Sequence, residues 1–163
     1  MTMPSGGGGS STGQKPPLTA ARFAIRIEGS AKPAAVFTEL GGISSEVEIV
    51  EYLATDSVSG AVSHTKQYGK TKPPTITLKR GVDGDASLWA WHQMVLAGDP
   101  MAKMSCTLEL IGVDGKPKVT YWLSGAWPAK LDISGIKAGA TEVVVETVTF
   151  TCEEIKQMPP SGG

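Results

Sequence analysis

The sequence predicts a mainly β domain that contains one helix. Several segments alternate apolar and polar residues with the period of two that is typical of strands, as in residues 22–28 and 46–52. The alternating segment 75–81 stops at a glycine, and a Gly- and Asp-rich turn leads from it into a Trp-rich segment with helical spacing. This change of period indicates strands arranged around a single helix.

Length and charge limit the classes of function. A chain of 163 residues with 40% apolar content is enough for one domain with one continuous core. The formal net charge of −1 leaves no basic excess for a phosphate backbone, so we expect no nucleic-acid binding by the monomer. No apolar run approaches the roughly twenty residues that cross a bilayer. Because the N-terminus also lacks the order of a signal peptide, we expect cytoplasmic synthesis without stable membrane insertion.

The two ends differ in composition from the rest of the chain. Residues 1–17 are rich in Gly, Ser and Pro, and residues 158–163 form a similar short segment with two consecutive prolines. Such segments have too few apolar side chains to offset the entropy that is lost on ordering. We therefore expect one folded unit at 18–157 between two flexible tails.

The first strands follow one another along this unit. Residues 22–28 form a half-buried strand, and residues 35–40 form a weaker one. The pair Gly41-Gly42 is expected to end that strand before residues 46–52 resume the alternation.

The third strand and the segment after it are less regular. Val47 and Ile49 share one face of 46–52, whereas Val50 and Tyr52 have the opposite phase. Either both faces are buried or a bulge interrupts the strand. Residues 54–74 are polar and contain two glycines and two prolines, which predicts a loop. Loops of this length are usually functional or bound to a partner.

One helix is predicted at 85–96, with Asp85 able to cap its N-terminus. A core-facing stripe with the spacing i, i+3, i+4, i+7 is formed by Leu88, Trp91, His92 and Val95. Trp89 and Leu96 lie on a second apolar line. Two accounts stay open: the helix lies in a groove of its own domain, or Trp89 faces another subunit.

The C-terminal part predicts further strands. Residues 105–111 and 119–124 form a hairpin around an Asp-Gly turn, and residues 125–130 bend the chain. Residues 141–153 are expected to form the longest strand. Its polar face carries a row of hydroxyl side chains, which suits water or a water-filled lumen; the row consists of Thr147, Thr149 and Thr151.

No catalytic, cofactor or metal site is expected. His64 lies in the predicted loop and His92 on the apolar side of the helix, and neither has a readable nucleophile partner. The acidic residues around Glu48 are expected to decorate a solvated strand face. Cys106 and Cys152 lie in strand-like segments without metal-site spacing, so we expect buried free thiols, with a disulfide as the alternative.

Seven short motifs occur in a characteristic order between residues 21 and 154. They are Phe23-x-Ile25-x-Ile27-x-Gly29, Gly41-Gly-Ile43, Glu51-Tyr52, Thr75-Ile-Thr-Leu-Lys-Arg-Gly81, Leu88-Trp-x-Trp91, Ala126-Trp-Pro-x-Lys130 and Glu142-Val-x-Val-Glu146. In this order and spacing the chain resembles the tail tube proteins of contractile phages and phage-tail-like injection systems.

The resemblance implies both a fold and a function. The expected fold is a small antiparallel β-barrel or two-sheet sandwich with one flanking helix. The implied function is that of an inner tube subunit in stacked hexameric rings, which a contracting sheath drives through a target membrane. The implied partners are other copies of the chain, sheath, baseplate and tube-terminating proteins, with protein cargo in the lumen. The alternatives are a baseplate-proximal or tube-initiating ring protein and, less favoured, a small-ligand-binding β-barrel.

Residues for the subunit contacts follow from the tube interpretation. Unpaired strand edges of a small sheet can be completed by identical neighbours. The expected loop 54–74 is the candidate for contacts between stacked rings, through Val58, His64, Lys66 and Tyr68. Trp89 is the candidate on the helix, and the threonine row is the candidate lumen face. We expect assembly in the bacterial cytoplasm and a final place in a phage-tail-like particle or virion.

Overall fold

The computed structural model describes residues 17–135, 137–139 and 141–159. Most of the two predicted tails, residues 1–16 and 160–163, lies outside the described residues. The elements are β1 (Arg22–Ile27), β2 (Ala35–Phe37), β3 (Glu39–Thr55), β4 (Val62–Gly81), α1 (Ser87–Leu96), the 3-10 helix η1 (Pro100–Ala102), β5 (Met104–Ile111), β6 (Pro117–Ile133), β7 (Val145–Thr151) and β8 (Glu154–Gln157). The predicted mainly β fold with one α-helix is therefore confirmed.

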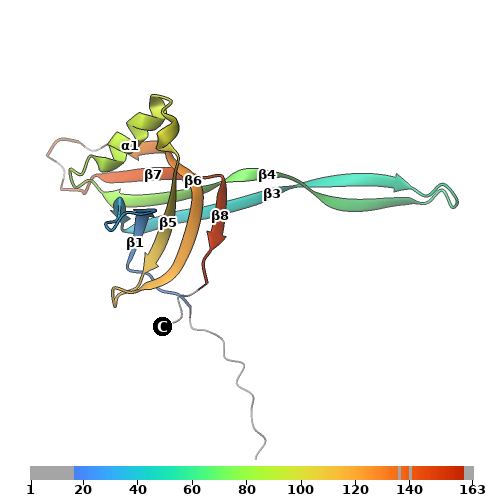
Figure 1. Cartoon of the computed structure of the whole chain (residues 1–163), viewed down its shortest axis with the longest axis horizontal. Coiled ribbons are helices and arrows are strands. Elements are labelled where there is room, and N and C mark those ends of the chain that lie inside the picture. Colours follow the sequence, from blue (N-terminus) through green and yellow to red (C-terminus); the bar gives the residue numbers. More distant parts are fainter. Residues whose placement is uncertain (1–16, 136, 140, 160–163) are drawn as a thin grey trace, which may run out of the picture.

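The strands pair in the order β2-β1-β5-β6-β7-β4-β3, and β8 pairs with β6 (Figure 1). The first half of β6 pairs with β5 and β8, whereas its second half, from Trp127 on, pairs with β7. Gly125, with φ +55°, lies at this change of partner, where a residue with a side chain would be strained. The sheet thus folds into two layers at β6, and the bend predicted at 125–130 is confirmed, although the strand continues through it.

The two end strands of the sheet are neighbours in the sequence. β2 and β3 lie at opposite ends of the pairing order and are joined by Thr38 alone. The Thr38 amide donates a hydrogen bond to the Lys79 carbonyl of β4 at 3.0 Å. The sheet therefore curls back on itself as a two-sheet sandwich, and no ladder between β2 and β3 closes it into a barrel in the described residues.

The core lies between the two layers. Phe37 of β2 and Phe150 of β7 meet edge to face with ring centroids 6.3 Å apart, and both side chains are fully buried. Burial of a large apolar side chain stabilises the fold by about 1.5–3 kcal/mol. Aliphatic side chains of both layers fill the remaining space, among them Ile25, Ile76, Leu78, Leu108, Leu123 and Val148.

The helix α1 is anchored by polar contacts as well as by packing. The Trp91 indole Nε1 donates to the Ala102 carbonyl at 2.7 Å, and His92 Nδ1 lies 2.8 Å from the Pro128 carbonyl oxygen. The predicted stripe is confirmed, since Leu88, Trp91 and His92 are buried, and His92 is a satisfied core residue. The helix starts two residues later than predicted, because Asp85 accepts a hydrogen bond from the Ser87 amide and forms a turn there.

Two expectations for the middle of the chain are wrong. Gly41-Gly42 does not end a strand, because β3 runs through both glycines and a register shift between Leu40 and Gly42 absorbs the irregularity. The segment 54–74 is not a loop, because most of it belongs to β4. Its polar residues and prolines enter a strand because β3 supplies a full-length pairing partner.

The C-terminal expectations also need correction. The longest strand is β4 with 20 residues, whereas β7 has only 7, because the chain before Val145 forms a connection rather than a ladder. The short strand β8 was not predicted. At the β5–β6 turn only Gly115 has a positive φ, of +79°, so the connection is longer than a tight two-residue Asp-Gly turn. The alternation predicted for β7 is confirmed, since Val148 and Phe150 are buried and the threonines between them are partly exposed.

The two cysteines are free and buried, as predicted. Burial raises the pKa of Cys106 from 9.0 to about 12 and the pKa of Cys152 to about 11. Below about pH 7.5 the thiols are almost entirely neutral in both the folded and the unfolded chain. Above that pH they ionise first in the unfolded chain, so the free energy of unfolding falls as the pH rises toward 11.

We expect the double variant Cys106→Ala/Cys152→Ala to lose less stability between pH 8 and pH 10 than the natural chain loses. Between these values, each thiol lowers the free energy of unfolding by at most about 1.4 kcal/mol for every tenfold fall in proton concentration. Urea unfolding at both pH values measures the difference. The comparison is between pH slopes, so the constant cost of the cavities left by the substitutions cancels. Equal slopes for the two proteins would contradict the prediction.

Candidate subunit interface

A two-stranded ribbon projects from the body of the molecule (Figure 1). It consists of the outer parts of β3 and β4, residues 45–55 and 62–74, and is called the arm below. β4 pairs with β7 only from Thr75 onward. Pro73 and Pro74 lack amide protons, and a register shift lies opposite them, which is where prolines are tolerated in a sheet. The part of β4 in the arm extends roughly 40 Å at about 3.3 Å per residue.

One face of the arm continues the core side of its sheet. Along β3, Ile43 packs against the core, and Val47, Ile49 and Leu53 occupy the same alternating positions farther out. The register pairs Ile49 with Tyr68 on β4. Because a strand alternates its side chains, these apolar residues continue the core side of the sheet along the arm, with the Glu51–Lys66 pair between Ile49 and Leu53 and no covering layer in this chain.

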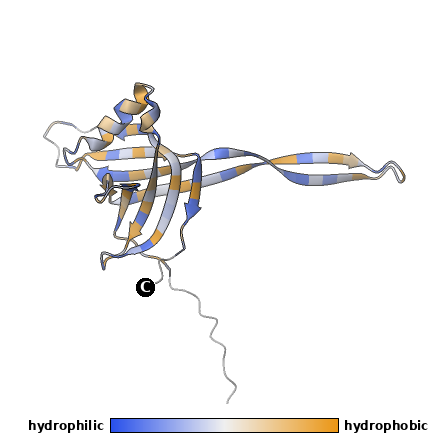
Figure 2. Ribbon diagram, in the orientation of Figure 1, coloured by the Kyte–Doolittle hydropathy of each residue, from blue (hydrophilic) through white to orange (hydrophobic). Residues whose placement is uncertain are grey.

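These apolar side chains are strongly exposed in the isolated chain. The exposed fraction is 69% for Ile49, 70% for Leu53, 58% for Val62 and 96% for Tyr68. In Figure 2 the hydrophobic positions of the arm lie mainly along β3, where they alternate with hydrophilic ones, whereas β4 is mostly hydrophilic there. A two-stranded ribbon is marginally stable by itself, and a contiguous apolar surface of this kind marks an interaction site. The arm is therefore the strongest candidate interface of the chain.

Charged pairs across the arm contribute little to its stability. Lys72 Nζ lies 2.7 Å from the Glu46 carboxylate, and Lys66 Nζ lies 3.9 Å from that of Glu51. All four side chains are more than half exposed, and such pairs contribute at most about 1 kcal/mol. They make the arm soluble; Glu51 and Lys66 lie on the same face as Ile49 and Tyr68, whereas Glu46 and Lys72 lie on the other face.

The tip of the arm is held by Asp56. Its carboxylate accepts hydrogen bonds from the amides of Val58 at 2.7 Å and Ser59 at 3.3 Å. These bonds lower the pKa of Asp56. Gly60, with φ +68°, closes the turn, and the Val58 side chain is left 95% exposed at the end of the arm.

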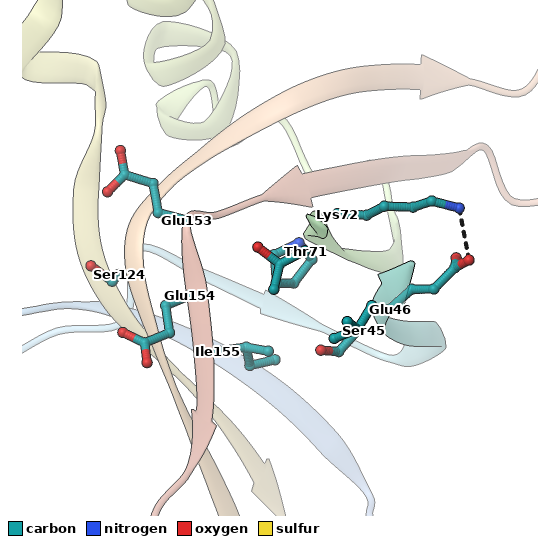
Figure 3. A pocket seen from close by; sticks show the side chains of 10 residues that line it. Ser45, Glu46, Thr71, Lys72, Ser124, Glu153, Glu154 and Ile155 are labelled. Carbon is teal, nitrogen blue, oxygen red and sulfur yellow. Dashed lines mark hydrogen bonds and ion pairs between the residues drawn. The ribbon is translucent and has the colours of Figure 1, made fainter. Parts of the chain in front are cut away.

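A polar notch lies where the arm leaves the body (Figure 3). It has a volume of about 450 Å³, and its walls come from the base of the arm and from the β7–β8 corner, with Glu46, Lys72, Glu153 and Glu154 among the lining side chains. Each of these carboxylates has a lysine partner, as Glu46 has in Lys72. The charges at the notch are thus compensated within the chain.

An apolar groove runs beside α1. It has a volume of about 380 Å³ and is lined by Ile27, Ala34, Ser87, Leu88, Ala90, Trp91, Met94 and Met104. No charged side chain contributes to its walls. A third hollow, of about 220 Å³, contains Asp99 and Lys103 beside Trp127. The groove is therefore the least polar of these three hollows.

A polar face covers the outside of the layer formed by β3, β4, β7 and the second half of β6. The threonine row lies on this face, where Thr149 pairs with Thr77 of β4 and with Lys130 of β6. Its charges balance, because Lys79 lies 3.8 Å from Glu39 and Lys130 lies 3.1 Å from Asp132. The face offers many hydroxyl groups and little net charge.

Two strand edges of this layer have no partner in the described residues. One is the outer edge of β3 along its whole length, and the other is the edge of β6 that faces away from β7, from Trp127 to Ile133. Unpaired edges are templates for pairing with another chain.

The predicted contact residues fall on the arm and on α1. His64, Lys66 and Tyr68 lie on one face of β4, and Val58 lies at the tip. Ile49, Leu53 and Val62 were not predicted as contact residues, although the alternation of 46–52 placed Ile49 on one face of a strand. Trp89 is partly buried, and its ring meets His92 edge to face at 6.2 Å.

No group of three or more His, Cys, Asp or Glu side chains in the part of the chain that the structure describes could hold a metal ion. The ten-residue helix α1 is far too short to span a membrane, and the described residues contain no longer helix that could do so.

Comparison with known families identifies the family of the chain. Residues 19–156 match the family described as T4-like virus tail tube protein gp19. The chain belongs to this family. It is therefore a tail tube protein with a structural role, and the predicted resemblance is confirmed. No curated protein matches the chain.

Solved structures of injection-system particles share the fold of this tail tube protein. A chain of the PVC sheath–tube complex, an extracellular contractile injection system in the extended state, matches with a TM-score of 0.70 and 21% identity, covering 88% of this chain and 93% of that one. A chain of the tube-terminating cap of the anti-feeding prophage gives 0.70 and 21%, covering 89% and 93%. A chain of the baseplate of the same prophage gives 0.60 and 17%, covering 89% and 97%.

Proposed function

We propose that this protein is the inner tube subunit of a contractile phage-tail-like injection system and that it forms stacked hexameric rings around a hollow lumen. The observation that carries the proposal is the arm, whose apolar face has no cover in the isolated chain. Family membership supports a tube, and the arm supplies the contact that a stack of rings needs.

The two open edges supply the contact within a ring. The outer edge of β3 in one copy pairs with the free edge of β6 in the next copy. Such a head-to-tail contact closes into a ring when its rotation permits. Four strands of each copy then form one continuous wall, and the face with Thr147, Thr149 and Thr151 lines the lumen.

The lumen lining and the partner proteins of the tube follow from this arrangement. A balanced, hydroxyl-rich lining interacts weakly with passing protein cargo of either charge. Matches to chains of sheath–tube, cap and baseplate structures support a sheath, a tube terminator and a baseplate as partners. The subunit assembles in the bacterial cytoplasm and becomes part of the particle, which is driven through a target membrane when the sheath contracts.

Microscopy and sedimentation test the proposal directly. The purified full chain is concentrated, sedimented and imaged by negative stain. Rings and tubes of uniform diameter are expected, and mass spectrometry should find the chain in contractile particles from its source. A chain that sediments as a monomer at high concentration and is missing from such particles would contradict the proposal.

Trp89 serves as a contact residue on the outside of α1. We expect Trp89→Ala to reduce assembly more than it reduces the stability of the subunit, because the Trp89 ring is only partly buried within its own subunit. Thermal melting of dilute subunits and sedimentation of concentrated ones measure the two effects. Equal losses in both measurements would assign Trp89 to the core of its own subunit.

A further inference from the structure

We propose that the Ile49–Tyr68 pair of the arm docks in the α1 groove of another copy of the chain. The inference rests on the proposed function and identifies where the arm binds. One chain leaves two apolar surfaces uncovered. The arm has an apolar face without a cover, and the body has an apolar groove without an occupant.

The arm does not fill its own groove. It extends to the right, away from the body, whereas α1 lies on top of the body (Figure 1). A contact between the arm of one copy and the groove of another joins two different surfaces, and repetition of such a contact builds a closed ring or an open filament. Because the open edges of β3 and β6 supply the contact within a ring, the arm contact is assigned to the stacking of rings.

The chemistry of the hollows selects the groove. The polar notch contains Glu46, Lys72 and Glu153, and the hollow beside Trp127 contains Lys103. Covering these groups with an apolar side chain would remove charges from water, which is unfavourable. The α1 groove has no charged side chain in its walls, so it is the surface on which an apolar pair is stabilised.

The arm pair has the form of an interface anchor. Ile49 and Tyr68 lie directly opposite each other across the ladder, so they enter a hollow together. Tyrosine is enriched among residues that dominate binding energy. Ser87 is the hydroxyl side chain of the groove and already donates to the Ala34 carbonyl at 3.2 Å. Its oxygen can still accept a hydrogen bond from the Tyr68 hydroxyl.

A pair of neighbouring substitutions on α1 tests the groove. Met94 lines the groove, whereas Gln93 is exposed and is not among the residues that line it. With Met94→Lys we expect rings that still form, with the fraction pelleting as tubes reduced about tenfold or more, because an ammonium group opposes an apolar contact. The matched control Gln93→Lys should leave the tubes unchanged. Normal tubes from Met94→Lys, or equal losses from both variants, would overturn the inference.

Cysteine cross-linking locates the contact independently. The variant Lys66→Cys/Ala90→Cys places one thiol on the arm beside Tyr68 and one on the rim of the groove. Oxidised tubes should give a ladder of covalent multimers on a non-reducing gel, and each single variant should give dimers at most. The pair Lys66→Cys/Glu154→Cys tests the notch, and a ladder from that pair instead would overturn the inference.

The outcomes separate this inference from the proposed function. If the natural chain forms no rings, both fail. If it forms tubes, but Lys66→Cys/Ala90→Cys gives no covalent multimers and Met94→Lys leaves the tubes unchanged, only the docking inference fails. Loss of co-sedimentation with a sheath protein in Met94→Lys, while tubes stay intact, would assign the groove to the sheath and also overturn it.

Discussion

Shortening the arm is expected to abolish tube formation while the subunit still folds. The variant lacks residues 48–70 and closes the pair Val47–Thr71 with an Asn-Gly turn, which suits a two-residue hairpin. The removed part makes its ladder contacts within the arm, so the core keeps its packing. Negative-stain microscopy should show single rings or free subunits, and circular dichroism should show an unchanged melting transition.

Point substitutions test whether the apolar face of the arm makes the contact between rings. Leu53→Ser on the apolar face should reduce the yield of tubes strongly, because a buried leucine contributes about 1.5–3 kcal/mol to a contact that each ring repeats around its circumference. Glu48→Ser lies on the other face of the same strand and should leave the yield unchanged. Long tubes from the shortened arm, or equal effects of the two serine variants, would remove the arm from the axial contact.

Breaking the buried ion pair of the body is expected to cost about 3–5 kcal/mol of unfolding free energy. Arg80 Nε lies 2.7 Å from the Glu146 carboxylate, and the two residues are 4% and 3% exposed. The guanidinium also lies 5.7 Å from the centre of the Phe37 ring and 3.4 Å from the Asp85 carbonyl oxygen. Glu146→Ala leaves this buried charge with only the half-exposed Asp85 carboxylate, 3.8 Å from Arg80 Nη1.

A matched exposed pair provides the control. Glu39 and Lys79 are 3.8 Å apart on the solvent side of the same sheet, so Glu39→Ala should cost at most about 1 kcal/mol. The double variant Arg80→Met/Glu146→Leu should recover most of the lost stability, because apolar replacement of both partners leaves no charge in the core. Urea unfolding of dilute subunits measures all three. A cost below about 1 kcal/mol for Glu146→Ala would show that water reaches the pair.

The strands of the body were predictable because each is half-buried against one core. Ile25, Leu108 and Val148 alternate with polar neighbours, and the burial of the folded chain repeats this pattern. The α1 stripe was predictable for the same reason at helical spacing. The beginning of the helix was not, because the Asp85 carboxylate bonds to the Ser87 amide and delays the first turn.

The arm was not predicted from the sequence. Two prolines and Gly69 in the segment 54–74 indicate a loop, since local preferences there oppose a strand. The ladder with β3 overrides them, and bulges opposite the prolines accommodate the missing amide donors. The alternation of Val47, Ile49 and Leu53 was visible, but it could not show that the covering layer belongs to another molecule.

By itself the sequence determined the mainly β class, the single helix, the buried thiols and the tail tube family, because these depend on local periodicity and on motifs in a fixed order. Only the tertiary structure decided that the segment expected as a loop is half of a long arm. It also decided that β6 joins the two layers and that the apolar groove lies beside α1. The physical reason is that pairing between strands far apart in sequence sets which faces are covered, and one chain alone leaves the arm uncovered.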